Sequence, residues 1–394
     1  MVQSLSAMAD IEVFCVSPVY PKVDFLEPRR YLYRRCVEKA PFTSLPVHFI
    51  QYPAFPLLSR PFNGSTLASR LIPELARMRF DVIVSCFAYP DGFAAVLAGE
   101  ELGIPVIVET LGSDLRCAKS MWARRLVRRA LGKASLVTAV SAELRERALE
   151  LGVAPNRVRV MRWGCDEGVF HLADRTLART QLNIPQDAEL IVFVGRLVEI
   201  KGLRELFTAL PGLVAERPAV KLACIGEGPM EQELRSRALK SGVADRTIFV
   251  GSLDPHGVAH WLAASNLLCL PSHSEGLPSV VLEAFACGRP VVASAVGGIP
   301  EVVDPSCGIL TFPKDPVSLS RALSDCLSQE WDAKLISGRF NRTWRDVARD
   351  TYNACLEVLR ESGNSAAAFP AWDQTDSLRA LTSIPSEDSA APCQ

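Results

Sequence analysis

The sequence of 394 residues lacks several patterns that would each assign it to a particular class of protein. Its 12 cysteines are scattered singly, with no C-x-x-C pair, which argues against a zinc site. It has no D-x-D triplet to hold a metal ion. The formal net charge is only −1, which removes the electrostatic argument for nucleic-acid binding. No uninterrupted apolar run approaches the roughly 20 residues that span a bilayer.

The N-terminus and the cysteines indicate the cellular compartment. The opening stretch MVQSLSAMADIEVFCVSP has no basic segment followed by a long apolar run, so we expect no signal peptide. Its IEVFCVS segment looks instead like a first buried strand. Cys15, Cys224 and Cys269 lie within apolar runs, where cysteine behaves as a small hydrophobic residue. We expect them to be reduced structural thiols, which are typical of a reducing compartment and predict a cytoplasmic protein.

The length and the pattern of apolar residues predict two domains. Hydrophobic residues make up 48% and charged residues 22% of the chain, as in ordinary globular proteins. Short Val- and Ile-rich runs alternate with longer helical segments, as parallel strands covered on both faces do. These runs occupy residues 81–87, 105–110, 135–140, 158–163, 189–195, 221–226, 247–251, 266–272 and 290–294. The fold class is therefore α/β, with two Rossmann-like domains facing each other across a cleft.

The expected domain boundaries follow from where the strand pattern restarts. We expect an N-terminal domain at residues 1–170 and a C-terminal domain at 171–345. Residues 346–362 form a terminal helix expected to pack back towards the N-terminal domain. Residues 363–394 are rich in Ala, Ser, Pro and Asp, with little apolar surface to bury, and are predicted to be disordered.

The segment FVGRLVEIKGL has the form of an anion site. A strand ends at Gly195, and Arg196 and Lys201 follow in a short loop before a helix. Two cations at a helix N-terminus could clasp a pyrophosphate. The later segment CIGEGPM begins like G-x-G-x-x-G but has Glu231 at the sixth position, so the dinucleotide fingerprint fails. We interpret it as a tight turn at a strand end.

The segment EGLPSVVLEAFACGRPVVAS places two glutamates in an otherwise apolar region. Pro278 and Ser279 suit a helix start and Gly288 suits its end, which predicts a helix over 279–286. Glu283 lies inside this helix, and a buried carboxylate is costly unless it is paired or hydrogen-bonded. Glu275 lies just before the helix. The structural alternatives are a favourable helix-dipole position for Glu275 and a buried ion pair for Glu283.

Several ordered motifs resemble family-four retaining glycosyltransferases, over roughly residues 80–360. EGLPSVVLEAFACGRPVVASAVGGIPEVV resembles the family's E-x7-E segment, and VGRLVEIKG is similar to its donor-phosphate segment. FVGSL matches its base-edge loop, and YPDGFAAVLAGEELGIPVIVETLGSDL resembles its Y-P-D-G and G-[ST]-D segments. The resemblance implies the two-domain fold called GT-B and a nucleotide-diphosphate sugar as donor, bound mainly by the C-terminal domain.

The resemblance also implies roles for particular residues. Arg196 and Lys201 neutralise the diphosphate, Glu283 accepts hydrogen bonds from the ribose, and Glu275 from the donor sugar. The implied donor-binding set is Gly195, Arg196, Lys201, Leu253, Glu275, Gly276, Leu277, Pro278 and Glu283. The implied catalytic set is Arg196, Lys201, Glu275 and Asp114, and the acceptor side comprises Tyr89, Asp91, Gly112, Ser113 and Asp114. No cofactor and no metal are implied, and the acceptor is a sugar or a lipid-linked molecule.

The sequence departs from the family pattern at four places. SPVYPKVDFLEPRRY contains no glycine where the family usually has a Gly-Gly loop that contacts the diphosphate or the acceptor. Leu111 stands where a His or Arg commonly precedes G-[ST]-D. Trp163 replaces a polar residue in the inter-domain segment WGCD, and Ser279 replaces a usual Asn. The identity of donor and acceptor therefore does not carry over from relatives.

Other interpretations remain open at this stage. The basic stretch RRLVRR, residues 124–129, is either an ordinary solvated helix face or a peripheral membrane contact at the inner face of the membrane. His256 and His260 have helical spacing but no third ligand, so we expect no metal there. The competing functions are a catalytically degenerate sugar-nucleotide-binding protein and a GT-B sugar epimerase or phosphorylase.

Overall fold

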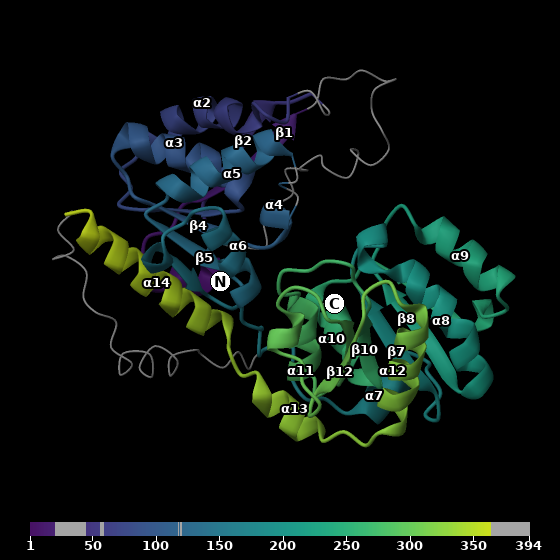
Figure 1. The fold of residues 1–394 in the computed structure, drawn as a ribbon. Helices are drawn as coiled ribbons and strands as arrows, with labels where there is room; N and C mark the ends of the chain where they lie inside the picture. Colours follow the sequence, from purple (N-terminus) through teal and green to yellow (C-terminus); the bar gives the residue numbers. More distant parts are fainter. Residues whose placement is uncertain (20–44, 56–58, 117, 119, 364–394) are drawn as a thin grey trace, which may run out of the picture.

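The structure, a computed structural model, describes residues 1–19, 45–55, 59–116, 118 and 120–363. In this part of the chain the strands form parallel sheets in two domains, purple to blue for the N-terminal domain and teal to green for the C-terminal domain in Figure 1. The tail beyond residue 363, predicted to be disordered, lies outside the described residues. So does most of the glycine-free segment SPVYPKVDFLEPRRY.

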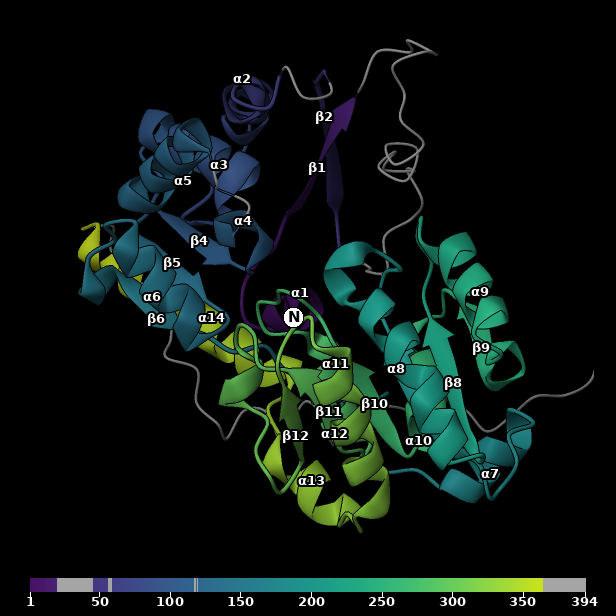
Figure 2. The same cartoon turned by 45° about the vertical axis from the view of Figure 1, so that its right-hand side comes forward.

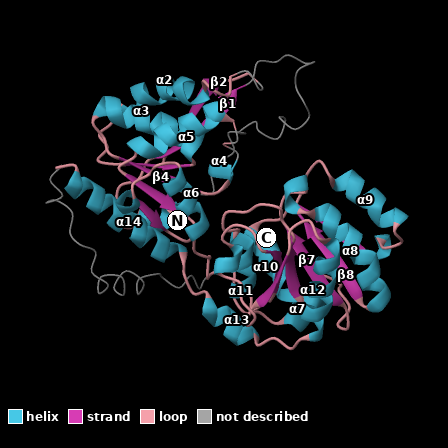
Figure 3. Cartoon of the chain, viewed as in Figure 1, coloured by secondary structure: helices cyan, strands magenta, loops and turns pink. Residues whose placement is uncertain are grey.

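The C-terminal domain is built on a six-stranded parallel sheet. Its strands run in the spatial order β12 (Gly308–Thr311), β11 (Val291–Ser294), β10 (Leu267–Leu270), β7 (Glu189–Val194), β8 (Val220–Ile225) and β9 (Thr247–Gly251). Every residue of β10 and β11 is buried, so helices cover both faces of the sheet, as the apolar runs predicted (Figure 3). The strand β12, only four residues long, was not predicted.

The helices of the C-terminal domain follow the strands in turn. They are α7 (Arg175–Gln181), η4 (Glu199–Lys201), α8 (Leu203–Glu216), α9 (Glu231–Lys240), η5 (Ala244–Arg246), α10 (Pro255–Ala264), α11 (Ser279–Ala286), η6 (Ile299–Glu301), α12 (Pro316–Ser328) and α13 (Ala333–Arg339). The helix α11 has the bounds predicted from the sequence, and Gly288 ends it with a φ of +69°. Phe285 of α11 and Phe193 of β7 are fully buried in one continuous core.

The N-terminal domain divides its described strands between two sheets. A four-stranded parallel sheet has the order β3 (Ile83–Cys86), β4 (Val106–Thr110), β5 (Leu136–Ala139) and β6 (Val158–Val160). The strands β1 (Val13–Val19) and β2 (Val47–Pro53) pair in parallel with each other as a separate ribbon (Figure 2). The predicted strand at β1 is present, but only Ser17 in it is buried, so its interpretation as a buried strand was wrong.

Short and long helices complete the N-terminal domain. They are α1 (Val2–Leu5), α2 (Asn63–Leu75), η2 (Ala88–Gly92), α3 (Phe93–Leu102), α4 (Ser113–Arg116), α5 (Met121–Lys133), α6 (Ala142–Glu150) and η3 (Pro155–Arg157). The predicted helical segments around residues 91–103 and 118–134 correspond to α3 and α5. Gly103 closes α3 with a φ of +72°, the left-handed conformation that glycine adopts at helix ends.

The last helix, α14 (Trp344–Glu361), returns from the C-terminal domain and lies along the N-terminal domain (Figure 1). Thr343 and Asp346 form a capping box at its start. Ala354 and Val358 of α14 bury apolar surface against Ile107 and Leu136, which belong to β4 and β5. The helix α1 packs on the same helix. The chain crosses between the domains twice, once after β6 and once before α14. We call the place where these two crossing segments meet the hinge.

The two crossing segments contact each other closely at this hinge. Cys165 pairs with Thr343 in a parallel bridge, and its N–H donates to the carbonyl of Arg342 at 2.9 Å. The ring of Trp163 lies 5.7 Å from that of Trp344. The tryptophan that departs from the family pattern thus packs the first crossing segment against the second.

Among the described residues, no helix has both the length and the apolar character needed to cross a bilayer. Eight cysteines within the described ranges are free thiols: Cys86, Cys165, Cys224, Cys269, Cys287, Cys307, Cys326 and Cys355.

Candidate functional site

The loop that follows β7 brings Lys201 against Glu275. Gly202, with a φ of +67°, lets η4 turn directly into α8, and a Cβ there would lie only 1.9 Å from the carbonyl oxygen of Pro271. Any side chain at position 202 would collide with Pro271. With glycine there, the end of η4 packs directly against the segment that follows β10. Lys201 Nζ then donates to Glu275 Oε1 at 2.7 Å, with the carboxylate side chain only 10% exposed.

This salt bridge bears on the helix-dipole explanation for the position of Glu275. Two residues predicted from separate motifs, 74 positions apart, share one salt bridge at the carboxyl ends of β7 and β10. An ammonium beside a half-buried carboxylate offsets the cost of taking that carboxylate out of water. Glu275 is therefore held by a cation from the opposite loop rather than by a helix dipole alone.

Arg196 lies in the same loop as Lys201 but behaves differently. It directly follows Gly195, whose φ of +152° turns the chain out of β7. The Arg196 side chain is exposed, and no described residue forms an ion pair or a side-chain hydrogen bond with it. Arg196 is thus a cation without a partner among the described residues, whereas Lys201 in the same loop is paired.

Glu283 is the second carboxylate of this segment. It lies on α11 between buried neighbours, and burial raises the pKa of its carboxyl from 4.5 to about 7. Within the described ranges no basic side chain pairs with it, so the alternative of a buried ion pair is not supported. Its charge contributes to the raised pKa of the Cys165 thiol, which places it near the first crossing segment.

Backbone turns rich in glycine pack around the Lys201–Glu275 pair. Gly298 N–H donates to the carbonyl of Gly276 at 2.6 Å. A Cβ on Gly297, whose φ is +62°, would lie 2.0 Å from the carbonyl oxygen of Glu275. The AVGGIP segment therefore lies directly against the loop that carries Glu275, and its glycines are needed for that approach.

The turns after β8 and β9 pack on the turn after β7. A Cβ on Gly226 would lie 2.1 Å from the carbonyl oxygen of Gly195, and Gly226 N–H donates to the carbonyl of Gly251 at 2.8 Å. CIGEGPM is thus a tight turn, as interpreted from the sequence. Leu253, the predicted base-edge residue, follows β9 and is 38% exposed.

The G-S-D loop of the N-terminal domain touches the loop of the C-terminal domain. A Cβ on Gly276 would lie 2.1 Å from the carbonyl oxygen of Leu111, and one on Gly112 would lie 3.0 Å from the Gly276 nitrogen. Leu277 and Leu282 bury their side chains in the core of the N-terminal domain. The structure therefore brings the predicted donor and acceptor segments together at one contact between the domains.

The Asp114 carboxylate accepts hydrogen bonds from backbone N–H groups. Its Oδ1 accepts from Gly112 N–H at 2.9 Å, and its Oδ2 accepts from Ala88 N–H at 3.0 Å. Burial raises the pKa of this carboxyl, and the backbone hydrogen bonds oppose that shift. Asp114 thus holds the G-S-D loop against the turn after β3, a structural role that the sequence did not reveal. Ser113, beside it, is exposed.

Tyr89 and Asp91 lie in the turn η2 but are used differently. The Tyr89 hydroxyl donates to the carbonyl of Arg60 at 2.5 Å and accepts from Gly64 N–H at 3.2 Å, which ties η2 to the start of α2. Burial raises the pKa of Asp91 to about 6, and no described side chain pairs with it. Asp91 is therefore the predicted acceptor-side carboxylate that the fold leaves free.

Two polar pairs near the site were not predicted from the sequence. His273 Nε2 lies 3.0 Å from Glu205 Oε1, between the segment after β10 and α8. Arg116 donates through Nη1 to Ser274 Oγ at 2.8 Å, across the domain contact. Arg116 follows Asp114 by two positions, but its partner is 158 residues away, so nothing local in the sequence signals the contact.

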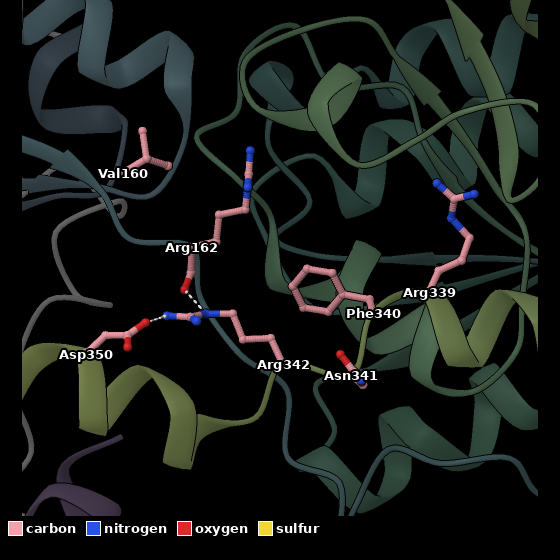
Figure 4. A pocket seen from close by; sticks show the side chains of 7 residues that line it. All are labelled: Val160, Arg162, Arg339, Phe340, Asn341, Arg342 and Asp350. Atoms are coloured by element: carbon pink, nitrogen blue, oxygen red, sulfur yellow. Dashed lines mark hydrogen bonds and ion pairs between the residues drawn. The ribbon is translucent and has the colours of Figure 1, made fainter. Parts of the chain in front are cut away.

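A pocket of about 280 Å³ lies at the hinge, between the segment that follows β6 and the segment that leads into α14 (Figure 4). It is lined by Val160, Arg162, Arg339, Phe340, Asn341, Arg342 and Asp350. The arginines there are paired: Arg342 donates to Asp350 Oδ2 at 2.6 Å and through Nε to the carbonyl of Arg162 at 2.8 Å. None of the predicted site residues lines this pocket. Within the described part of the chain, no group of three or more His, Cys, Asp or Glu residues could hold a metal ion.

Comparison with known proteins identifies the family. The family described as "Glycosyl transferase 4-like domain" matches residues 1–164, and "Glycosyl transferases group 1" matches residues 174–341. A Bacillus subtilis glycosyltransferase named for teichuronic acid biosynthesis, TuaC, is 34% identical over 303 residues, 75% of this chain and 70% of the relative. The chain belongs to the group 1 glycosyltransferases. The family resemblance drawn from the sequence motifs is therefore confirmed.

Other relatives act on different small molecules according to their names. The D-inositol 3-phosphate glycosyltransferase of Acidothermus cellulolyticus is 29% identical over 351 residues, covering 83% of this chain and 74% of the relative. The N-acetyl-alpha-D-glucosaminyl L-malate synthase of Bacillus anthracis is 30% identical over 257 residues, 64% of each chain. This glycosyltransferase thus has relatives with unlike acceptors.

Solved structures confirm the fold of this glycosyltransferase. Sucrose-phosphate synthase from Thermosynechococcus elongatus superposes with a TM-score of 0.74 at 21% identity, covering 91% of this chain and 92% of that one. HepE from Anabaena, solved in complex with UDP, gives a TM-score of 0.62 at 20% identity, covering 82% and 86%. The predicted α/β architecture with the GT-B fold is therefore confirmed.

Proposed function

We propose that this glycosyltransferase moves a sugar from a nucleotide-diphosphate donor to an acceptor hydroxyl, with retention at the anomeric carbon and without a metal ion. The observation that carries the proposal is the Lys201–Glu275 salt bridge beside the exposed Arg196, at the carboxyl ends of the strands of the C-terminal sheet. Ligands of open α/β sheets bind at that edge. The UDP in the solved HepE complex supports a nucleotide donor.

Charge complementarity favours the diphosphate as the group that this loop binds. Arg196 has no partner among the described residues, and Lys201 has one carboxylate. When a diphosphate enters, both cations gain an anionic partner in a site of low dielectric, where such hydrogen bonds are strong. The cations then stabilise the charge that develops on the departing diphosphate, a role that a metal ion would otherwise take.

The two glutamates suit the neutral parts of the donor. Glu275, already fixed by Lys201, accepts hydrogen bonds from hydroxyls of the donor sugar. Glu283 is partly buried and has no partner among the described residues, and its pKa is raised to about 7, so ribose hydroxyls would supply the hydrogen bonds that the fold does not. Exposed Leu253 lies at the base edge.

The reaction needs no protein nucleophile. The bond between the anomeric carbon and the diphosphate oxygen breaks, and the diphosphate leaves with the electron pair. The acceptor oxygen bonds to the same face of the carbon, and its proton passes to the departing phosphate. Arg196 and Lys201 lower the barrier because their charges are in place before the diphosphate charge develops. Asp91, the unpaired carboxylate of η2, suits a hydrogen bond to an acceptor hydroxyl.

We also propose that the acceptor is a sugar or a lipid-linked molecule in polysaccharide, glycolipid or glycoconjugate synthesis. The name of the relative TuaC supports this class. The helix α5 exposes Met121 and Trp122 next to Arg124, Arg125 and Arg128. A helix with exposed apolar residues and several arginines suits peripheral binding to an anionic membrane, which supports the proposal that the enzyme acts at the inner face of the membrane in the cytoplasm.

A donor screen tests the proposal. The purified protein is incubated with a panel of nucleotide-diphosphate sugars, and release of the nucleoside diphosphate is measured with and without added glycosyl acceptors. We expect one donor to stand out, with release that depends on Lys201, and an axial or equatorial product linkage that matches the donor by NMR. Binding of a donor without hydrolysis or transfer would instead favour a degenerate sugar-nucleotide-binding protein.

A further inference from the structure

Arg116 makes a contact that joins the two domains next to the donor site. Its guanidinium donates through Nη1 to Ser274 Oγ at 2.8 Å and through Nη2 to Glu143 Oε2 at 2.5 Å. Ser274 belongs to the C-terminal domain and directly precedes Glu275, whereas Glu143 lies on α6 of the N-terminal domain. The Arg116 side chain is only 13% exposed, so this contact lies inside the domain contact rather than at its rim.

The contact continues as a chain of polar groups that crosses between the domains again. The backbone N–H of Glu143 donates to Glu301 Oε1 at 3.2 Å, in η6 of the C-terminal domain. Glu301 Oε2 accepts from Arg162 Nη2 at 3.0 Å, at the first crossing segment of the hinge. Figure 4 shows Arg162 at the hinge pocket, where its carbonyl accepts from Arg342. One network therefore runs from Ser274 to the hinge.

The packing around Arg116 leaves the loop of Glu275 little freedom. A Cβ on Gly297 would lie 2.8 Å from Arg116 Nη2 and 2.0 Å from the carbonyl oxygen of Glu275. The guanidinium, the AVGGIP turn and the Glu275 backbone thus lie against one another. A movement that separates the domains at this contact breaks the Arg116–Ser274 hydrogen bond, at the residue next to Glu275.

We propose that Arg116 is a positioning residue that couples domain closure to the placement of Glu275. The proposal rests on the assignment of Glu275 to the donor site. Arg116 contacts neither of the two donor cations. It acts through Ser274 by holding the Glu275 loop against the N-terminal domain, where the acceptor segment lies. Loss of this contact therefore lowers the rate of transfer more than the affinity for a nucleotide, which the C-terminal domain binds.

Arg147 provides a matched control within the same network. It also pairs with Glu143, on the same helix, but its side chain is 45% exposed and none of its described contacts reaches the C-terminal domain. Exposed pairs of this kind contribute little to stability. Arg147→Ala removes a comparable charge from Glu143 and leaves the Arg116–Ser274 hydrogen bond intact.

The test compares Arg116→Ala, Arg116→Lys, Ser274→Ala and Arg147→Ala with the wild type. We expect Arg116→Ala and Ser274→Ala to lower kcat by about 10- to 100-fold, the range for losing a hydrogen bond to a charged group, with UDP affinity within about twofold. The double variant should resemble Arg116→Ala, because both single variants already remove the Arg116–Ser274 hydrogen bond. Arg116→Lys restores part of the rate, and Arg147→Ala leaves it unchanged.

Small-angle X-ray scattering tests the closure itself without relying on activity. We expect a larger radius of gyration for Arg116→Ala and Ser274→Ala than for the wild type and Arg147→Ala. Equal radii, or losses in UDP affinity as large as the losses in kcat, would overturn the proposal. If the wild type transfers no sugar, the proposed function fails while the scattering still decides the role of Arg116. If Arg116→Ala does not fold, Ser274→Ala, which removes one hydroxyl, carries the same test.

Discussion

The two domains use most of their predicted site residues in different ways, with Asp91 of the N-terminal domain as the exception. In the C-terminal domain the predicted charges are engaged with each other or with nothing: Lys201 pairs with Glu275, and Glu283 has no partner among the described residues. In the N-terminal domain the side-chain oxygens of Asp114 and Tyr89 form hydrogen bonds with backbone groups, mostly those of neighbouring loops. Polar side chains that have no hydrogen-bond partner within the fold indicate a ligand site, whereas those that have such partners indicate a structural role.

The sheets differ in the same sense. The C-terminal sheet has six strands around one core, and its site loops leave its carboxyl edge. The described strands of the N-terminal domain form a four-stranded sheet and a separate two-stranded ribbon. The donor side is thus built on one rigid element, and the acceptor side on several smaller ones. The comparison predicts large functional effects for changes in the C-terminal domain and structural effects for changes in the N-terminal domain.

The largest effect should come from the donor cations. We expect Arg196→Ala and Lys201→Ala each to lower turnover by about 100- to 1,000-fold, the range for removing one preorganised group from a developing charge. Steady-state kinetics with the donor found in the screen measures this. Arg204→Ala, which removes a cation from an exposed network on α8, is the control and should keep wild-type kinetics. Unchanged turnover in both cation variants would remove the donor site from this loop.

The next effect is structural and belongs to the N-terminal domain. Asp114→Ala leaves the N–H groups of Ala88 and Gly112 without their acceptor, so the free energy of unfolding should fall by about 2–3 kcal/mol. Chemical denaturation measures this loss. If Asp114→Ala keeps wild-type stability but loses transfer, the residue is catalytic, and the contrast between the domains is wrong for it.

A smaller effect is expected at Tyr89. Tyr89→Phe removes the hydroxyl that links Arg60 and Gly64, which should cost about 1 kcal/mol of stability. The KM for the acceptor should not change, because the hydroxyl serves the backbone. An increase in this KM without a change in melting temperature would return Tyr89 to the acceptor site.

The smallest effect concerns metal ions. Because Arg196 and Lys201 supply the positive charge at the diphosphate, excess chelator should leave the initial rate unchanged. A rate that disappears with chelator and returns with one divalent cation would show that the cations do not suffice.

The sequence predicted the parts of the site that depend on local pattern. The bounds of α11, the turn at Gly195 and the tight turn at Gly226 follow from glycine, proline and periodicity, and the structure has them. The salt bridge between Lys201 and Glu275 was not predicted, because it depends on how two loops 74 residues apart meet.

Contacts between distant parts of the chain escaped the sequence for the same reason. The Arg116–Ser274 hydrogen bond joins residues 158 positions apart, and Asp114 reaches Ala88 across two loops. The strand β2 was missed because His48 and Gln51 interrupt VHFIQYP, so it lacks the continuous Val- and Ile-rich run by which the other strands were predicted, and it ends in proline. The strand β1 is only partly buried because β2 is its only neighbour among the described strands.

Glu283 gives the most direct test of the account, because it is a partly buried carboxylate with no partner among the described residues and is proposed to bind a nucleotide. Its pKa in the folded protein, about 7, is above the ordinary 4.5, so the protonated form stabilises the fold at low pH. This stabilisation disappears as the pH rises through 7, and the charged carboxylate then costs up to about 3 kcal/mol. Glu283→Gln removes that cost and should be more stable than the wild type above pH 7, with little difference near pH 5.

The direct measurement is a set of melting curves for the wild type and Glu283→Gln at pH 5 and pH 8, with and without UDP. The account predicts that the unliganded variant melts higher than the wild type at pH 8. It also predicts that UDP stabilises the wild type more than the variant, because ribose hydroxyls bond best to the charged carboxylate. A variant that melts lower than the wild type at pH 8 and keeps the full stabilisation by UDP would contradict it.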